Sequence, residues 1–274
     1  MSYSVLAEGG LDYFPCRYGT SKLLFRGPRR RLDSRYVAAV GGTEVYGKFV
    51  ERPFPDLLED HTGLPVVNFG AVNAGIDVFS CDETVMTACS GARVVVLQAM
   101  GAHNLRNRFY AVHQRRNDRF LRASPLLQVL YPEVDFTEFA FTRHLIRTLH
   151  EIDPERFVSV REELQSAWIA RMSSFLDGVR APVVLLWMAE RGPEEPSDLN
   201  KATDPLFVTD GLIAAVRPRL AGVVEARPSP AARAMGSAGL VCSEIEALAA
   251  AEVPNPAVHA ETAFALAQGL REMI

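Results

Sequence analysis

The sequence contains little cysteine and no long apolar run, and each absence excludes a class of protein. The four cysteines are scattered, with no Cys-x-x-Cys pair and no spacing typical of a disulfide framework, so we expect free thiols in a reducing compartment. No stretch approaches the roughly 18 to 20 apolar residues that span a membrane, and the first ten residues lack the pattern of a signal peptide. We therefore expect a cytoplasmic protein with no membrane partner.

Charge and histidine spacing exclude further classes. The net charge is −4, from 29 basic and 33 acidic residues, which gives no global attraction to nucleic acid. The six histidines show no His-x-x-x-His or mixed Cys/His ligand spacing, so no metal site is predicted. A Gly-x-Gly-x-x-Gly turn and a Walker loop are also absent, which disfavours a nucleotide-binding α/β fold, and we predict no cofactor.

Continuous apolar runs alternate with helical patterns along most of the 274 residues. Five runs predict buried parallel strands, at about 36–40, 64–70, 92–100, 183–188 and 222–226. Helices are expected between them, among them a long amphipathic one over about 157–179. This alternation predicts an α/β fold, a three-layer sandwich around a five-stranded parallel sheet.

Two segments differ from this alternation. Residues 1–35 lack periodicity and predict an N-terminal arm that packs on an α/β domain formed by residues 36–274. Residues 105–150 are rich in arginine and aromatic residues, and we interpret them as a mostly helical insertion.

The most informative segment is the one that ends the first predicted strand. Its apolar run leads into Gly41, Gly42 and Thr43, and Gly47 follows four residues after the threonine. Such a strand-to-helix turn places one hydroxyl at the carboxyl edge of the sheet, where open α/β folds hold their sites. Thr43 is therefore the first candidate site residue, and capping of the following helix is its alternative role.

This segment resembles the first motif block of the SGNH (GDSL-type) hydrolases, Gly-Asp-Ser with a glycine four residues later. Gly42 stands at the Asp position and Thr43 at the position of the nucleophile. The resemblance extends from about residue 36 to the C-terminus, outside the insertion, and implies a flavodoxin-like strand order. It also implies an oxyanion site to which the Gly42 and Gly70 backbones contribute, because Asn68–Gly75 matches the second block.

The third and fourth blocks are altered. In Gly101-Ala102-His103-Asn104, His103 stands where the family has its oxyanion-binding Asn, and a shift of one residue would place Asn104 there. The family's Asp-x-x-His falls on Ala250 and Val253. The resemblance therefore leaves His259, which matches a second histidine of some members, as the candidate base, and Glu252 stays open beside it if the loop register differs. A helix cap or surface role for His259 is the alternative.

Six arginines crowd the segment from Leu105 to Arg122 against one acid, Asp118. Arginine suits bidentate binding of phosphate, sulfate or carboxylate. The insertion follows the third block directly, so it would overhang the site, and an arginine-rich solvated surface is the alternative. The candidate ligand contacts are Glu44, Asn73, Arg106, Arg108, Arg115 and Arg116.

The leading functional hypothesis is hydrolysis or transfer of an ester-linked acyl group on an anionic small molecule or sugar. A non-catalytic ligand-binding protein that kept the cleft is the alternative, and a homo-oligomer is compatible with either. A third hypothesis is a sulfotransferase, because Arg17-Tyr18-Gly19-Thr20-Ser21 resembles the phosphate loop of enzymes that use a phosphosulfate donor. The chain also resembles an uncharacterised bacterial family through Asp12–Gly19, Lys22–Arg30 and Asn107–Tyr110, which implies no activity.

Overall fold

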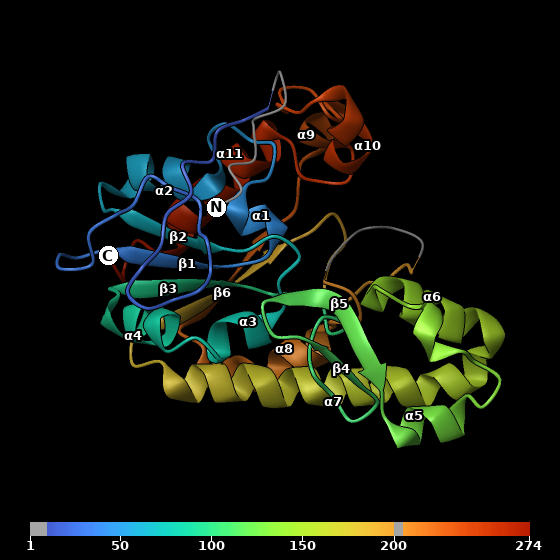
Figure 1. Ribbon diagram of the computed structural model, residues 1–274. Helices are drawn as coiled ribbons and strands as arrows, with labels where there is room; N and C mark the ends of the chain where they lie inside the picture. Colours follow the sequence, from blue (N-terminus) through green and yellow to red (C-terminus); the bar gives the residue numbers. More distant parts are fainter. Residues whose placement is uncertain (1–9, 200–204) are drawn as a thin grey trace.

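A five-stranded parallel sheet forms the centre of the protein (Figure 1). The structure is a computed structural model that describes residues 10–199 and 205–274. The strands follow the order β2-β1-β3-β6-β7, which is the flavodoxin-like order. They are β1 (Val37–Gly41), β2 (Val66–Gly70), β3 (Val94–Gln98), β6 (Val183–Met188) and β7 (Gly222–Ala226). The predicted fold class is confirmed, since continuous apolar runs form strands that are covered on both faces.

Helices cover the two faces of the sheet because successive side chains of each strand point in opposite directions. One face packs on α1 (Thr43–Tyr46), α2 (Phe54–Thr62), α9 (Pro230–Ala234) and α11 (Pro256–Gly269). The other packs on α3 (Ile76–Ser80), α4 (Glu83–Gly91), α7 (Pro154–Gly178) and α8 (Asp210–Val216). A short α10 (Ala247–Ala250) and three 3₁₀ turns, at Phe136–Glu138, Arg217–Arg219 and Glu244–Glu246, complete the connections.

The long helix α7 begins at Pro154, directly after the capping residue Asp153. The Asp153 side chain accepts a hydrogen bond from the Arg156 N–H, and Pro154 fills the first helical position. The apolar stripe of α7 is buried from Phe157 to Leu176, as the three- and four-residue spacing predicts. No helix among residues 10–199 and 205–274 is long and apolar enough to cross a membrane.

The insertion is only partly helical, which corrects the sequence prediction. It begins with an antiparallel hairpin, β4 (Tyr110–His113) and β5 (Arg116–Ala123), and only then continues into α5 (Pro125–Leu130) and α6 (Thr142–Ile152). Buried and more exposed positions alternate along β4, and this period of two is the pattern of a half-buried strand. The pairing of β4 with β5 contains two register shifts, on either side of Val112.

The N-terminal segment lies against the body through aromatic residues and one buried arginine. Phe25 is fully buried, and its backbone pairs with Cys16 in an isolated bridge. Arg26 is 6% exposed and donates hydrogen bonds to the carbonyls of Tyr46, Gly47 and Glu51. Its guanidinium therefore satisfies three carbonyl groups of the turn that follows α1.

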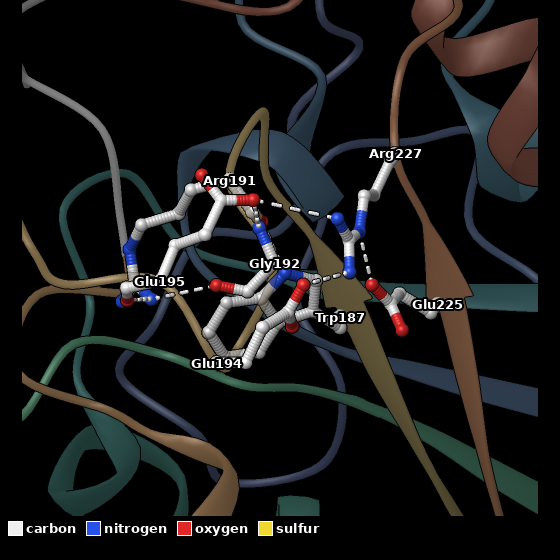
Figure 2. Close-up of polar contacts among 7 residues, drawn as sticks. All are labelled: Trp187, Arg191, Gly192, Glu194, Glu195, Glu225 and Arg227. Carbon is white, nitrogen blue, oxygen red and sulfur yellow. Dashed lines mark hydrogen bonds and ion pairs between the residues drawn. The ribbon is translucent and has the colours of Figure 1, made fainter.

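A second buried arginine holds the loop that follows β6 (Figure 2). The Arg191 guanidinium donates to the carbonyl oxygens of Gly192 at 3.1 Å, Glu195 at 2.9 Å, Pro205 at 2.5 Å and Val208 at 2.9 Å. One side chain thus fixes both ends of this loop at the carboxyl edge of the sheet.

Beside it, Arg227 ties the same loop to β7 from the surface (Figure 2). It pairs with Glu194 at 2.8 Å and Glu195 at 3.4 Å, and it also contacts Glu225. The Arg227 side chain is 40% exposed, so these pairs are far more hydrated than the contacts of Arg191.

Candidate functional site

A cavity of about 440 Å³ opens at the carboxyl edge of the sheet, beside the ends of β1 and β3. The chain leaves β1 toward β2 on one side and returns to β3 on the other, so the strand order reverses at this point, where open α/β folds bind ligands. The lining residues are Gly42, Thr43, Glu44, Lys48, Val72, Asn73, Ala74, Gln98, Met100, His103, Asn104, Asp118, Phe141, Thr142, Arg143, Ala249, Glu252 and Val253. We call it the Thr43 cavity.

Thr43 forms a two-way hydrogen-bonded pair with Asn73 from the loop after β2. The Asn73 backbone N–H donates to Thr43 Oγ1 at 3.0 Å, and the Thr43 hydroxyl donates to Asn73 Oδ1 at 3.2 Å. Asn73 adopts a φ of +56°, a left-handed conformation that asparagine tolerates. The helix cap is Gly42, without a side-chain hydrogen bond, so the alternative role of Thr43 as the cap is wrong.

Asn73 connects Thr43 to a buried carboxylate on the hairpin. Its Nδ2 group donates to Asp118 Oδ2 at 3.4 Å, and Arg116 lies 4.0 Å from the same oxygen. Asp118 is 8% exposed, and its Oδ1 is buried and accepts no hydrogen bond within the described part of the chain. The carboxylate favours the amide orientation in which Nδ2 faces Asp118 and Oδ1 faces Thr43. The Thr43 proton therefore rests on an amide oxygen, which is not a base near neutral pH.

A second chain of hydrogen bonds closes the other wall of the cavity. Gln98, at the end of β3 and 2% exposed, accepts from the Gly42 N–H and donates to Glu44 Oε2, each at 2.8 Å. The Gly42 N–H is thus occupied and does not point to a free oxyanion site. The Gly70 N–H likewise donates to Asn68 Oδ1 at 2.8 Å, and Gly70 does not line the cavity.

Both candidate residues of the third block line the cavity. His103 is 2% exposed, and its carbonyl oxygen accepts the Tyr110 hydroxyl at 2.7 Å. Asn104 Oδ1 accepts the Thr142 hydroxyl at 2.6 Å, so the Nδ2 group of Asn104 is the end that can donate to a ligand.

His259 lies elsewhere, which contradicts its predicted role as the base. It is 1% exposed on α11, its Nδ1 accepts the Phe54 N–H at 3.0 Å, and it does not line the Thr43 cavity. Burial, helped by the nearby Arg26 charge, lowers the pKa of His259 to about 3. The hydrogen bond from the Phe54 N–H to His259 Nδ1 links α11 to the start of α2. A different group must therefore serve as the base.

The predicted arginine contacts also lie outside the Thr43 cavity. Arg108 pairs with Glu163 at 2.5 Å, while Arg106 and Arg115 line two other cavities. Arg116 contacts the site only through Asp118. These arginines lie on different segments: Arg106 and Arg108 precede β4, Arg115 lies between the two strands, and Arg116 begins β5. Among the lining residues within 10–199 and 205–274, two cations, Lys48 and Arg143, accompany three carboxylates, those of Glu44, Asp118 and Glu252. This balance does not favour an anion.

Sequence reasoning missed Gln98, Asp118, Lys48 and Arg143 as site residues. Two of them carried a signal: Gln98 is the polar residue in an apolar strand, and Asp118 is the single acid among six arginines. Lys48 and Arg143 carried none. No group of three or more His, Cys, Asp or Glu residues among 10–199 and 205–274 could hold a metal ion.

The proposed phosphate loop does not have the predicted context. Residues 17–21 follow an isolated bridge rather than a strand of the parallel sheet, and no helix begins directly after them. Thr20, Ser21 and Lys22 line a cavity of about 320 Å³ together with Asp82 and Glu83, and Ser21 donates to Asp82 at 2.6 Å. Two carboxylates of this wall are balanced by Lys22 and Arg115, and residues 17–21 lack the strand and helix of the predicted phosphate loop, so the structure does not support the sulfotransferase hypothesis.

Gly75 lets the loop that holds Asn73 approach the third block. A Cβ at this position would lie 1.7 Å from the Asn104 carbonyl oxygen, and the φ of −109° is unstrained, so the constraint is purely steric. We expect Gly75→Ala to lower the free energy of unfolding by about 3 kcal/mol, measured by urea denaturation. In Gly222→Ala the added Cβ meets its nearest atoms at 3.8 Å, so it should cost under about 1 kcal/mol. Equal urea midpoints for Gly75→Ala and Gly222→Ala would show that the contact between Gly75 and the Asn104 carbonyl is not tight.

The chain belongs to the family described as Domain of unknown function (DUF6473), whose model matches residues 1–274. A search of curated proteins finds no matching sequence.

Three solved structures of enzymes are among the similar folds. A carbohydrate esterase family 2 enzyme with a carbohydrate-binding domain from Corynascus thermopiles (Myceliophthora fergusii) has a TM-score of 0.46 and 11% identity, over 90% of this chain and 69% of that one. The lipase Lip_vut3 from a goat rumen metagenome has a TM-score of 0.41 and 13% identity, over 88% and 97%. A gut microbial diltiazem-metabolizing enzyme has a TM-score of 0.39 and 10% identity, over 86% and 47%. Similarity at this level does not establish a shared function.

Proposed function

We propose that the protein hydrolyses an ester-linked group of a polar small molecule, an acylated sugar, in the Thr43 cavity. The observation that carries this proposal is the buried carboxylate of Asp118, whose Oδ1 has no hydrogen-bond donor among the described residues although Asp118 lines a cavity at the switch point of the sheet. The Asp118 side chain as a whole is 11% exposed, and its carboxylate can accept a proton from a water bound in the cavity.

The proposed reaction uses water as the nucleophile. The Asp118 carboxylate takes a proton from the water while the water oxygen attacks the ester carbonyl carbon. The oxyanion that forms accepts hydrogen bonds from Asn104 Nδ2 and His103. Collapse of this intermediate breaks the bond to the alcohol oxygen, which takes the proton back from Asp118. Thr43 and Asn73 hold Asp118 in position and contact the substrate. Thr43 is not the nucleophile in this proposal, since its hydroxyl donates to the Asn73 amide oxygen.

The lining supports a sugar rather than a strongly anionic substrate. Carboxylates and side-chain amides accept and donate hydrogen bonds to hydroxyl groups, and the two cations are already outnumbered by three carboxylates. Phe141, which is 42% exposed, adds an apolar face at the same cavity. A volume of about 440 Å³ suits a monosaccharide ester.

The test is acetate release from glucose pentaacetate. We expect Asp118→Asn to lower kcat/KM about 100-fold, because an amide of the same shape cannot accept the proton. Thr43→Val should lower it about tenfold, since only positioning and a substrate contact are lost. Asp60→Asn, at an exposed site on α2, should leave the rate unchanged. Equal rates in wild type and Asp118→Asn would exclude Asp118 as the base.

A non-catalytic binding protein is the second candidate, and one observation favours it: the Thr43 proton rests on the Asn73 amide rather than on a base. In that case wild type would release no acetate, while calorimetry would still detect binding of the sugar ester and its loss in Thr43→Val.

A further inference from the structure

A second cavity, of about 430 Å³, lies on the other side of β5 from the Thr43 cavity. Asn117 lines this second cavity, and its neighbour Asp118 lines the first. Its lining residues come from the hairpin, from α3 and its C-cap, from the segment before β4 and from α7. It is lined by Asp77, Cys81, Arg106, Ala111, Val112, Gln114, Asn117, Leu121, Arg122 and Arg171, none of which lines the Thr43 cavity. We call it the arginine cavity.

Three guanidinium groups reach the arginine cavity from three separate segments. Arg106 precedes β4, Arg122 lies on β5, and Arg171 lies on α7. Asp77 is the one acid among the lining residues that the structure describes. It accepts the Arg106 backbone N–H at 2.8 Å and pairs with Arg171 at 3.5 Å. The formal charge of the lining is therefore +2, although the whole chain carries −4.

The charges of Arg106 and Arg122 are uncompensated. Neither side chain forms an ion pair with another residue in 10–199 or 205–274, and both are exposed at the cavity mouth. Like charges that share a concave surface repel one another, so an anion that bridges them gains energy from each. Guanidinium groups also match the geometry of carboxylate, phosphate and sulfonate oxygens.

The remaining wall is apolar, which restricts the ligand further. Ala111, Val112 and Leu121 line it, and the Leu121 side chain is 57% exposed on the strand that carries Arg122. A small inorganic anion would leave this surface in contact with water. A ligand with an apolar body would cover it and gain the hydrophobic contribution of the buried area.

We propose that the arginine cavity binds an organic anion in which a sulfonate, phosphate or carboxylate group is attached to an apolar body. Arg106, Arg122 and Arg171 hold the anionic group, and Val112 and Leu121 contact the body. This site is independent of ester hydrolysis in the Thr43 cavity, and binding at it is measurable without any turnover.

The experiment is isothermal titration calorimetry of the full-length protein with 1-naphthalenesulfonate, which has no ester to hydrolyse. We expect one binding site, weaker binding of methanesulfonate and of 1-naphthol, and an affinity that falls as salt is raised. The double variant Arg106→Gln, Arg122→Gln should bind the probe at least tenfold more weakly. The matched control Arg180→Gln changes an exposed arginine outside the cavity and should bind like wild type.

Three outcomes would overturn the proposal. The first is absence of probe binding to wild type, and the second is equal affinity in wild type and the double variant. The third is loss of probe binding in Asp118→Asn, which would place the probe in the Thr43 cavity. Equal affinity for methanesulfonate and for the probe would overturn the proposal that the ligand carries an apolar body. None of these results depends on whether the protein releases acetate from a sugar ester.

Discussion

Arg191→Met is expected to lower the free energy of unfolding by about 4 kcal/mol. The substitution removes a guanidinium that donates to four carbonyl oxygens, those of Gly192, Glu195, Pro205 and Val208. Arg191 is 9% exposed, so several of these oxygens would be left without a donor and without water. The apolar methionine stem retains part of the packing on Trp187, whose ring lies 4.9 Å from the guanidinium. Urea denaturation followed by circular dichroism measures the effect.

The matched control is Arg227→Met, at the neighbouring arginine in Figure 2. Arg227 pairs with carboxylates that are 39% to 58% exposed, and such hydrated pairs contribute little to stability. We therefore expect a small change for Arg227→Met and a large one for Arg191→Met. Similar losses in the two variants would show that burial does not set the strength of these contacts.

The second large expected effect is a loss of folding stability at acidic pH that depends on His259. Its pKa is about 3 in the folded protein and 6.5 in the unfolded chain. Between these values the unfolded chain binds a proton that the folded protein does not, so stability rises with pH there and falls on acidification. At about 1.4 kcal/mol per pH unit, the loss between neutral pH and pH 4 is roughly 3 kcal/mol.

His259→Asn tests this origin, because an amide oxygen can still accept the Phe54 N–H but does not titrate. Unfolding free energies at pH 7 and pH 4 should differ by roughly 3 kcal/mol less in this variant than in wild type. His61→Asn, at an exposed histidine, should show the wild-type acid loss. The same acid loss in His259→Asn as in wild type would assign the sensitivity to the carboxylates.

The parallel sheet could be predicted from the sequence because its strands carry a strong local signal. Runs such as Val94–Gln98 are apolar without alternation, and the glycines after β1 mark the turn that positions Thr43. The hairpin could not be predicted in the same way. Its arginines are compatible with an exposed helix or an exposed strand, and β4 has only four residues in which to show a period of two.

The sequence predicted candidate site residues best where they follow the end of a predicted strand. Thr43 and His103 follow directly from the ends of β1 and β3. Asp118 belongs to the hairpin and reaches the cavity through tertiary folding, which no local pattern encodes. The prediction that His259 is the base was wrong for a related reason. The sequence places a histidine near the last helix, but its burial and its contact with Phe54 depend on the packing of α11 on α2.

The two register shifts in the hairpin have a consequence for both cavities. A strand that slips by one residue exchanges its two faces, which would place the Asp118 carboxylate among the arginines and the Asn117 amide beside Asn73. The irregular pairing on either side of Val112 opposes such a slip, because the extra residues of β5 would no longer stand opposite the same positions of β4. Insertion or deletion of a single residue in β5 would therefore change the chemistry of two sites at once, whereas a similar change in the turn between the strands would leave both in place.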